Sequence, residues 1–268
     1  MTTHTDPSIR LKRWIHMINI TLIGVNGKMG QVICRILENS EDAKIVCGID
    51  INTESKNGFP VYSSLSEAKE DCDVIIDFSH PSSLEGTLSY ALNNNKGVII
   101  ATTGLSPDQL SLINAASEKI PVFFSANMSL GVNLIIQLAK KATALLEDNF
   151  DIEIIEKHHN LKIDAPSGTA LAIADAINET STHANEYVYD RHSTRKKRSK
   201  REIGIHSLRG GTIVGEHSVI FAGNDELIEI KHTATSKEIF AVGAVKAARF
   251  LASKKPGLYS MDDLIAEF

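Results

Sequence analysis

Five short apolar segments, separated by stretches with helical spacing, constrain the fold of this chain more than any other feature. The segments are INITLIGV (18–25), AKIVCGID (43–50), DVIIDFS (73–79), GVIIATTG (97–104) and IPVFFSA (120–126). Helix-like segments, such as 82–94 and 107–118, lie between them. Strands that alternate with helices of about 10–15 residues predict βαβ units and a parallel sheet.

The sequence changes character after about residue 130, which indicates a second domain. A long helix is predicted at 131–148, a strand at 150–159, a helix at 167–180 and a last helix at 238–253. Between them, residues 201–235 hold three alternating, glycine-punctuated strands, a pattern typical of an antiparallel or mixed sheet. The fold class expected is therefore α/β, with a nucleotide-binding domain followed by a domain built on an open sheet.

Charge and cysteine content exclude several classes of function. The net charge of −5 gives a nucleic-acid partner no overall electrostatic support. Cys34, Cys47 and Cys72 have neither CxxC nor zinc-type spacing, which suits a reducing, cytoplasmic location. No apolar run approaches the roughly 18 residues that a membrane span needs. Residues 1–16 lack the apolar core of a signal peptide and are expected to be a disordered extension.

A glycine-rich turn follows the first predicted strand and opens the first helix. Gly24, Gly27 and Gly30 form G-x-x-G-x-x-G, and Asp50 ends the second strand 20 residues after Gly30. Such a turn presents helix N–H groups to a pyrophosphate, and such an acid accepts hydrogen bonds from a ribose diol. The alternative is that the glycines serve only strand-to-helix packing, but the agreement of strand, helix and acid favours dinucleotide binding.

The loops that follow the later strands are expected to line the same crevice. They are DFSHP (77–81), ATTG (101–104) and SANMS (125–129), and in parallel sheets ligands bind beyond the carboxyl ends of the strands. Ordinary turn and cap chemistry explains each loop taken singly. Their common location is what favours a binding role.

The stretch EKHHNLKIDAPSGTA (156–170) gathers proton-carrying and anion-holding groups in one loop. His158 and His159 fall on opposite faces of an ideal strand, so the backbone is expected to turn there. Lys162 follows, then Pro166 in the first turn of a helix, with free N–H groups predicted at 167–169 for a carboxylate. A histidine near neutral pH moves protons. Surface histidines beside an ordinary helix cap are the alternative, and a metal site is disfavoured because adjacent histidines diverge.

Blocks of sequence in a fixed order identify a family. From about Ile18 to the C-terminus the chain resembles the dihydrodipicolinate reductase family, on GVNGKMG, DFSHP, ATTG, SANMSLGVN, EIIEKHHNLKIDAPSGTA and IGIHSLRGGTIVGEHSVIF. The resemblance implies a Rossmann-like parallel-sheet domain (17–129) completed by the C-terminal segment (239–268). It also implies an α+β domain (130–238) with an open mixed sheet, which binds substrate and assembles a homotetramer.

The resemblance assigns roles to residues of this chain. It implies His158 as proton donor or acceptor, Lys162 as a second proton donor, and substrate contacts from His159, Gly168 and Thr169. It implies nicotinamide-cofactor contacts from Gly24, Val25, Asn26, Gly27, Lys28, Met29, Asp50, Ala101, Thr102, Thr103, Ser125, Ala126, Asn127 and Met128. The implied reaction is NAD(P)H-dependent reduction of 4-hydroxy-tetrahydrodipicolinate, a cyclic dicarboxylate of lysine and diaminopimelate synthesis.

Asp50 predicts that NADH is favoured over NADPH, because its carboxylate repels a 2′-phosphate and neither Ile51 nor Asn52 is an arginine. Lys28 and Lys56 are cations that can reach a phosphate, so exclusion of NADPH is not expected.

Two rival functions make different demands on the 153–170 block. A two-domain dehydrogenase of aspartate or diaminopimelate would have no use for the 153–170 block, and a non-catalytic NAD-binding sensor would be expected to lose His158 or Lys162. The basic stretch 191–201 is predicted to be a solvated loop that attracts an anionic substrate, rather than a nucleic-acid site.

Overall fold

The computed structural model describes residues 17–267, so the extension predicted at 1–16 lies outside the described residues. Two compact units divide the chain. One holds the described residues up to Val122 together with Ala248–Gly257, and the other holds Phe123–Ala247 and the described residues from Leu258. The functional domains proposed from the sequence, 17–129 with 239–268 and 130–238, remain a proposal. Within residues 17–267, no helix combines the length and apolar character that a membrane span requires.

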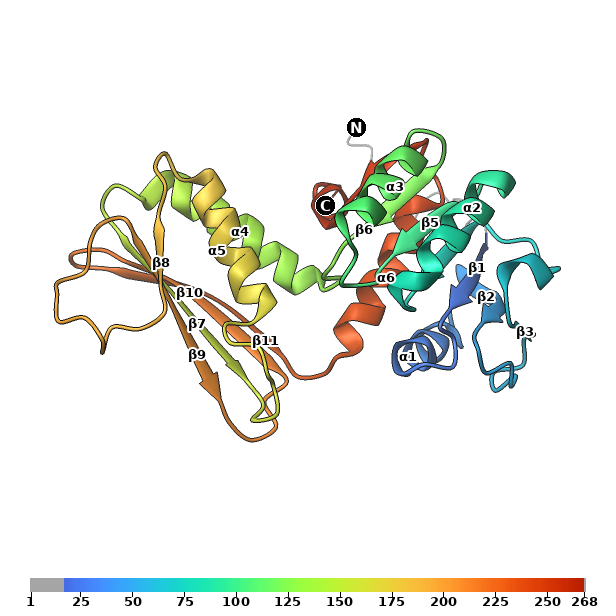
Figure 1. Ribbon diagram of the computed structural model, residues 1–268, viewed down its shortest axis with the longest axis horizontal. Helices are drawn as coiled ribbons and strands as arrows, with labels where there is room; N and C mark the ends of the chain where they lie inside the picture. The colour runs from blue at the N-terminus through green and yellow to red at the C-terminus, as the bar shows by residue number, and fades with distance from the viewer. Residues whose placement is uncertain (1–16, 268) are drawn as a thin grey trace, which may run out of the picture. The chain divides into compact units, whose positions relative to one another are not determined.

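Strands β1 to β5 of the first unit, labelled in part in Figure 1, belong to a sheet of which seven strands lie in the described residues, in the order β12-β6-β5-β4-β1-β2-β3. Their bounds are β1 Ile18–Ile23, β2 Ala43–Ile49, β3 Val61–Tyr62, β4 Val74–Asp77, β5 Gly97–Ile100, β6 Pro121–Phe124 and β12 Gly257–Tyr259. The boundary between the two units falls within β6 and within β12. The pairings of β1 with β2 and β4, and of β4 with β5, are parallel. All four residues of β4 and of β5 are buried, which explains their uninterrupted apolar runs.

Helices connect these strands, as the sequence predicts. They are α1 Lys28–Leu37, α2 Leu84–Asn94 and α3 Pro107–Ser117, with short 3-10 turns η1 Leu65–Glu67 and η2 Pro81–Ser83. Helix α3 begins with a capping box between Ser106 and Gln109, and α2 ends where Asn95 adopts a left-handed conformation, φ 51°. Local cap chemistry therefore fixes the helix boundaries that the sequence placed only approximately.

The second unit contains a mixed sheet, ordered β11-β10-β7-β9-β8 within the described residues. The strands are β7 Asp151–His158, β8 Glu186–Val188, β9 Glu202–Arg209, β10 Gly215–Ala222 and β11 Leu227–Ala234. Strand β7 lies in the middle, antiparallel to β10 and parallel to β9. A central strand is held on both edges, so side chains at its end are positioned firmly.

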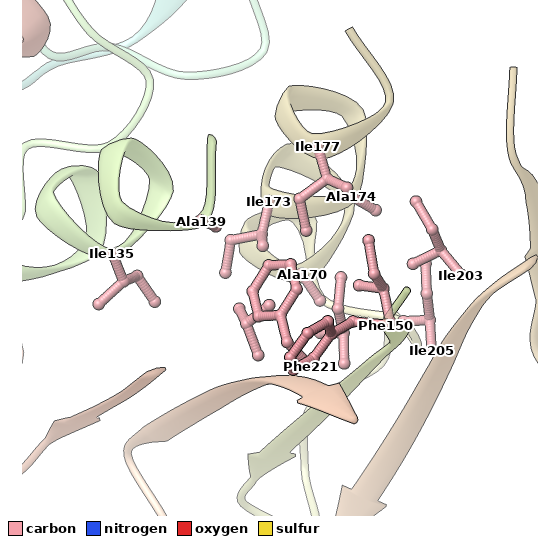
Figure 2. Packing of buried hydrophobic residues seen from close by; sticks show 13 residues of the cluster. Ile135, Ala139, Phe150, Ala170, Ile173, Ala174, Ile177, Ile203, Ile205 and Phe221 are labelled. Carbon is pink, nitrogen blue, oxygen red and sulfur yellow. The ribbon is translucent and has the colours of Figure 1, made fainter. Parts of the chain in front are cut away.

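Helices α4 Leu130–Leu146 and α5 Gly168–Thr180 pack on one face of this sheet and close its core (Figure 2). Alternate residues of β7 are buried, and Ile154, which pairs with Val219 of β10, belongs to one buried cluster with Phe221 of β10 and Ile173 of α5. The period-two pattern of a strand thus supplies one buried face. Burying these large apolar side chains contributes about 1.5–3 kcal/mol each.

The last part of the chain is helix α6 Glu238–Leu251, strand β12 and helix α7 Met261–Ile265. Strand β12 joins the sheet of the first unit beside β6, as the family resemblance implies. The short elements β3, β8, β12 and α7 were missed by the sequence analysis, because two to five residues do not establish a periodicity.

Candidate active site

A cavity of about 490 Å³ lies in the second unit. Its basic lining side chains are His158, His159, Lys162, His217, His232 and Lys237. No aspartate or glutamate is present among the described residues that line it. A hollow lined by imidazole and ammonium groups, without a carboxylate, is suited to an anionic ligand.

His158 reaches the cavity from the end of β7, on the buried face that it shares with Ile152 and Ile154. The chain then turns: Lys162 N–H donates to the His159 carbonyl at 3.2 Å, and Asn160 N–H donates to the Gly211 carbonyl at 3.2 Å. The turn predicted after the histidine pair is therefore confirmed. It brings both histidines to one cavity, which a continued strand would not do.

The start of α5 differs in detail from the prediction. Ser167 is the N-cap, its hydroxyl accepting from Ala170 N–H at 3.1 Å, and the helix begins at Gly168. The expectation that Pro166 lies in the first turn is wrong, because serine is a strong N-cap and places proline outside the helix. Ser167 N–H is not free either, since it donates to Glu156 at 3.1 Å. Gly168 and Thr169 remain at the cavity wall.

Lys162 lines the cavity with its ammonium group already paired. Its Nζ lies 2.7 Å from Oδ1 of Asp164, and this hydrogen bond lowers the pKa of Asp164 below its usual value. A ligand carboxylate in the cavity would share this cation with Asp164.

His217, His232 and Lys237 line the cavity but were missed by the sequence analysis. Each histidine sits in an alternating strand, and only the register that pairs His217 of β10 with His232 of β11 brings the two together. The signal was the period-two position of each histidine, but the pairing of strands is tertiary information.

His217 is buried, and burial lowers its pKa to about 4, so the ring is neutral near pH 7. Its Nε2 lies 2.8 Å from the Ser167 hydroxyl, which also accepts from Ala170 N–H. The His217 ring meets the His158 ring edge-on at 5.2 Å between centroids. Burial also lowers the pKa of His232.

The residues predicted to hold the cofactor pyrophosphate form the turn between β1 and α1. Gly24 has φ 77°, and a Cβ there would lie 2.8 Å from the Phe78 carbonyl oxygen, so a larger residue would be strained. Gly27 is the N-cap of α1 and brings no side-chain cap to it. The first N–H groups of α1 therefore have no side-chain cap competing with a phosphate, which fits a dinucleotide.

Asp50 follows β2 and contacts this turn. Its Oδ2 accepts from Asn26 N–H at 2.9 Å and its Oδ1 from Asn52 N–H at 3.0 Å. Each carboxylate oxygen can accept a second hydrogen bond, so a ribose diol remains acceptable. Lys28 is exposed beside the turn, while Lys56 pairs with Glu54 at 3.5 Å.

The other cofactor candidates fall in two places. Ala101, Thr102 and Thr103 follow β5, with the Thr102 hydroxyl 3.3 Å from the buried Asp77 carboxylate. Residues 125–128 follow β6 and belong to the second unit, where Ala126 and Asn127 line the cavity. The amide nitrogen of Asn127 lies 3.2 Å from the Thr169 hydroxyl. Residues predicted for cofactor and for substrate therefore meet at one cavity.

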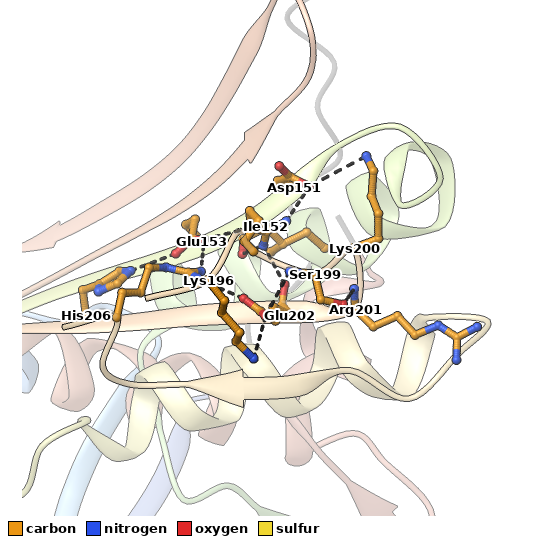
Figure 3. Close-up of polar contacts among 11 residues, drawn as sticks. Asp151, Ile152, Glu153, Lys196, Ser199, Lys200, Arg201, Glu202 and His206 are labelled. Atoms are coloured by element: carbon orange, nitrogen blue, oxygen red, sulfur yellow. Dashed lines mark hydrogen bonds and ion pairs between the residues drawn. The ribbon is translucent and has the colours of Figure 1, made fainter. Parts of the chain in front are cut away.

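The basic stretch 191–201 is exposed for most of its length, but several of its cations are paired (Figure 3). Arg191 contacts Glu153 at 2.6 Å and Glu202 at 2.8 Å, and Arg198 pairs with Asp151. Lys196 and Lys200 add looser pairs at 3.7 and 3.8 Å. Pairing with acids of the same unit weakens the idea that this stretch attracts an anionic substrate.

Comparison with known proteins identifies relatives over most of the chain. Residues 18–128 match the model of "Dihydrodipicolinate reductase, N-terminus", and residues 131–265 match "Dihydrodipicolinate reductase, C-terminus". A protein of Caldanaerobacter subterraneus subsp. tengcongensis named 4-hydroxy-tetrahydrodipicolinate reductase is 53% identical over 93% of this chain and 98% of its own length. One of the same name from Clostridium tetani is 49% identical over 93% and 97%.

Solved structures agree. A dipicolinate-bound dihydrodipicolinate reductase from Paenisporosarcina sp. TG-14 has a TM-score of 0.79 and 25% identity, covering 91% of this chain and 97% of that one. A C. glutamicum diaminopimelate dehydrogenase has a TM-score of 0.55 and 14% identity, covering 93% of this chain and 98% of that one. The second likeness is one of fold alone.

Proposed function

This chain belongs to the dihydrodipicolinate reductase family, and we propose that it catalyses the NAD(P)H-dependent reduction of 4-hydroxy-tetrahydrodipicolinate to tetrahydrodipicolinate. The observation that carries the proposal is the cavity whose ionisable lining side chains are histidines and lysines and which also includes Ala126 and Asn127 of a cofactor-candidate loop. A cyclic dicarboxylate, as in the dipicolinate-bound relative, matches this charge.

The substrate's two carboxylates match two separate anion-holding groups of the site. The ammonium of Lys162 holds one, and the start of α5 at Gly168 and Thr169 holds the other through the Thr169 N–H group and the helix dipole, because the Gly168 N–H already contacts Asp164. His159, at the turn after β7, adds a donor on the same wall. Two fixed anion sites orient the ring for reaction.

Proton delivery falls to His158. When bound, the nicotinamide cofactor supplies a hydride to the conjugated ring that remains after the 4-hydroxyl group has left as water, and the electron pair that this addition leaves on the ring must take a proton. His158 Nδ1 is engaged by Glu156 at 2.6 Å, so Nε2 is the nitrogen available to the cavity. The proton passes from His158 Nε2 to the ring, and Lys162, which lines the same cavity, is the second donor.

Cofactor choice follows from Asp50 and its surroundings. Asp50 accepts from Asn26 and Asn52 at the end of β2, and a carboxylate at this position of a nucleotide-binding fold repels a 2′-phosphate, which supports a preference for NADH. Lys56 is engaged by Glu54, and Lys28 is the exposed cation left beside the turn. NADH is therefore the favoured cofactor and NADPH a tolerated one.

Assembly into a homotetramer is proposed through the second unit. Helices α4 and α5 cover one face of its sheet, while Ile155, Leu208 and Ile220 alternate onto the other, where Leu208 is 47% exposed. Exposed apolar faces of sheets mark interfaces. The unpaired thiols of Cys34, Cys47 and Cys72 support a cytoplasmic location.

The deciding experiment follows NADH consumption with freshly prepared 4-hydroxy-tetrahydrodipicolinate. Turnover that depends on this substrate is expected, with none for NAD+ and diaminopimelate or aspartate. Oxidation of either amine, or cofactor binding without turnover, would replace the proposal with a rival function. Light scattering at micromolar concentration tests assembly, and a stable monomer would reject the tetramer.

A further inference from the structure

Glu156 is a buried carboxylate of β7 whose contacts extend beyond the His158 Nδ1 hydrogen bond described above. It lies on β7, two residues before His158 and on the same face, and its side chain is fully buried. A buried carboxylate is costly unless each oxygen is hydrogen-bonded and its charge is balanced. The groups that hydrogen-bond to Glu156 therefore indicate the role of its carboxylate.

Four N–H groups converge on this carboxylate. Oε2 lies 2.6 Å from His158 Nδ1 and accepts from Arg209 Nη1 at 2.8 Å. Oε1 accepts from Arg209 Nη2 at 2.7 Å and from Ser167 N–H at 3.1 Å. Burial raises the pKa of Glu156, but hydrogen bonds from Arg209 and His158 outweigh it and lower the pKa to about 2. An ionised carboxylate only accepts, so His158 Nδ1 must carry the hydrogen.

We infer that Glu156, whose charge is balanced by Arg209, is a positioning residue for two parts of the site, the His158 ring and the start of α5. Through His158 it fixes the tautomer and ring direction that leave Nε2 to the cavity. Through Ser167 N–H it holds the start of α5, where Gly168 and Thr169 bind a substrate carboxylate. The inference rests on the proposed role of His158 as proton donor.

The direction of the His158 ring supports this assignment. A Cβ built on Gly215, a residue of the cavity wall, would lie 3.2 Å from His158 Nε2, so this nitrogen faces the wall and not the protein core. Arg209 also donates to the Asp164 carbonyl at 2.6 Å, which ties the loop that carries Lys162 to β9. The same ion pair thus anchors the strand end, the loop and the helix start.

Glu156 is also the negative charge nearest to His158. The ionisable and charged groups around the ring are His217 of β10, Lys162 and His159 of the loop, Arg209 of β9 and Glu156. Without the carboxylate, His158 would be surrounded by cations and neutral rings, and its charged form would be disfavoured. A general acid must be protonated to act. As the pH is raised, a protein without the Glu156 carboxylate should therefore lose turnover at a lower pH than the wild type does.

The test is Glu156→Gln, which keeps the shape and removes the charge. We expect kcat to fall at least about tenfold and the alkaline limb of the kcat profile to move down by about one pH unit or more. KM for the dicarboxylate should rise, because the amide cannot accept from all four N–H groups.

The chain offers a matched control on the same strand. Glu153 also contacts a histidine and an arginine, His206 at 2.8 Å and Arg191 at 2.6 Å, but it lies on the opposite face of β7 and does not line the cavity. Figure 3 shows Glu153 beside His206. Glu153→Gln should leave kcat, KM and the pH profile at wild-type values. If Glu156→Gln lowered only the melting temperature and left kcat, KM and the pH profile unchanged, the Glu156 carboxylate would have a structural role alone. The inference would then fail.

A measurement on the wild type does not depend on how the variants fold. Nitrogen-15 NMR of histidine-labelled protein, with His158 assigned from a His158→Gln sample, should show hydrogen on Nδ1 in the neutral ring. Hydrogen on Nε2 instead would overturn the inference. These experiments distinguish failure of the proposed function from failure of this inference. Normal turnover by His158→Gln would remove His158 from the mechanism. Loss of turnover in His158→Gln together with normal turnover in Glu156→Gln would refute only the role of Glu156.

Discussion

The buried imidazole of His217 makes the stability of the second unit depend on pH in a calculable way. Burial lowers its pKa from 6.5 to about 4, so the folded protein binds this proton less readily than the unfolded chain. Its contribution is fully present above pH 6.5 and is lost as the pH falls towards 4. At pH 5.5 the difference between a pKa of 6.5 and one of about 4 corresponds to about 1.4 kcal/mol of lost stability.

His217→Gln removes this titration, and the glutamine amide keeps a hydrogen-bonding group for the Ser167 hydroxyl near the position of Nε2. We expect urea denaturation, followed by circular dichroism, to show that the wild type loses about 1.4 kcal/mol more than the variant between pH 7.5 and 5.5. Glu156 and Glu216, with pKa values lowered to about 2, do not titrate in this window. If the free energy of unfolding changed equally with pH in the wild type and the variant, the reasoning would be refuted. His217 would then have the same pKa in the folded and the unfolded protein.

Further expectations concern catalysis and cofactor binding. His158→Gln should lower kcat by roughly 10²-fold or more with unchanged NADH affinity, and near-normal turnover would exclude it as the acid. Lys162→Ala should lower kcat and raise KM together, whereas a change in kcat alone would mean that it holds no carboxylate. Gly24→Ala should weaken NADH binding about tenfold or more, because Gly24 has φ 77° and an added Cβ would lie 2.8 Å from the Phe78 carbonyl oxygen. Fluorescence titration measures this affinity, and equal affinity in both proteins would show that the turn accommodates the methyl group. With Asp50 in place, kcat/KM should favour NADH over NADPH by on the order of tenfold or less, and a clear NADPH preference would contradict this.

The sequence alone determined the features that depend on residues close together in the chain. The apolar strands from Ile18 onward, the glycine turn at Gly24 and the position of Asp50 follow from short-range patterns, because strand and helix periods and turn chemistry act over a few residues. The turn after His158 was also predictable, since two adjacent histidines on a strand point to opposite faces.

Tertiary structure decided what distant residues do to one another. Helix α5 begins one residue after Ser167 because that serine caps it while its N–H meets Glu156, eleven residues earlier on β7. Arg209 reaches the same carboxylate from β9, and His217 joins the cavity from β10. A single sequence states which residues are polar, but not which strands pair or in what register, and a buried charge is tolerated only where that pairing brings its partners.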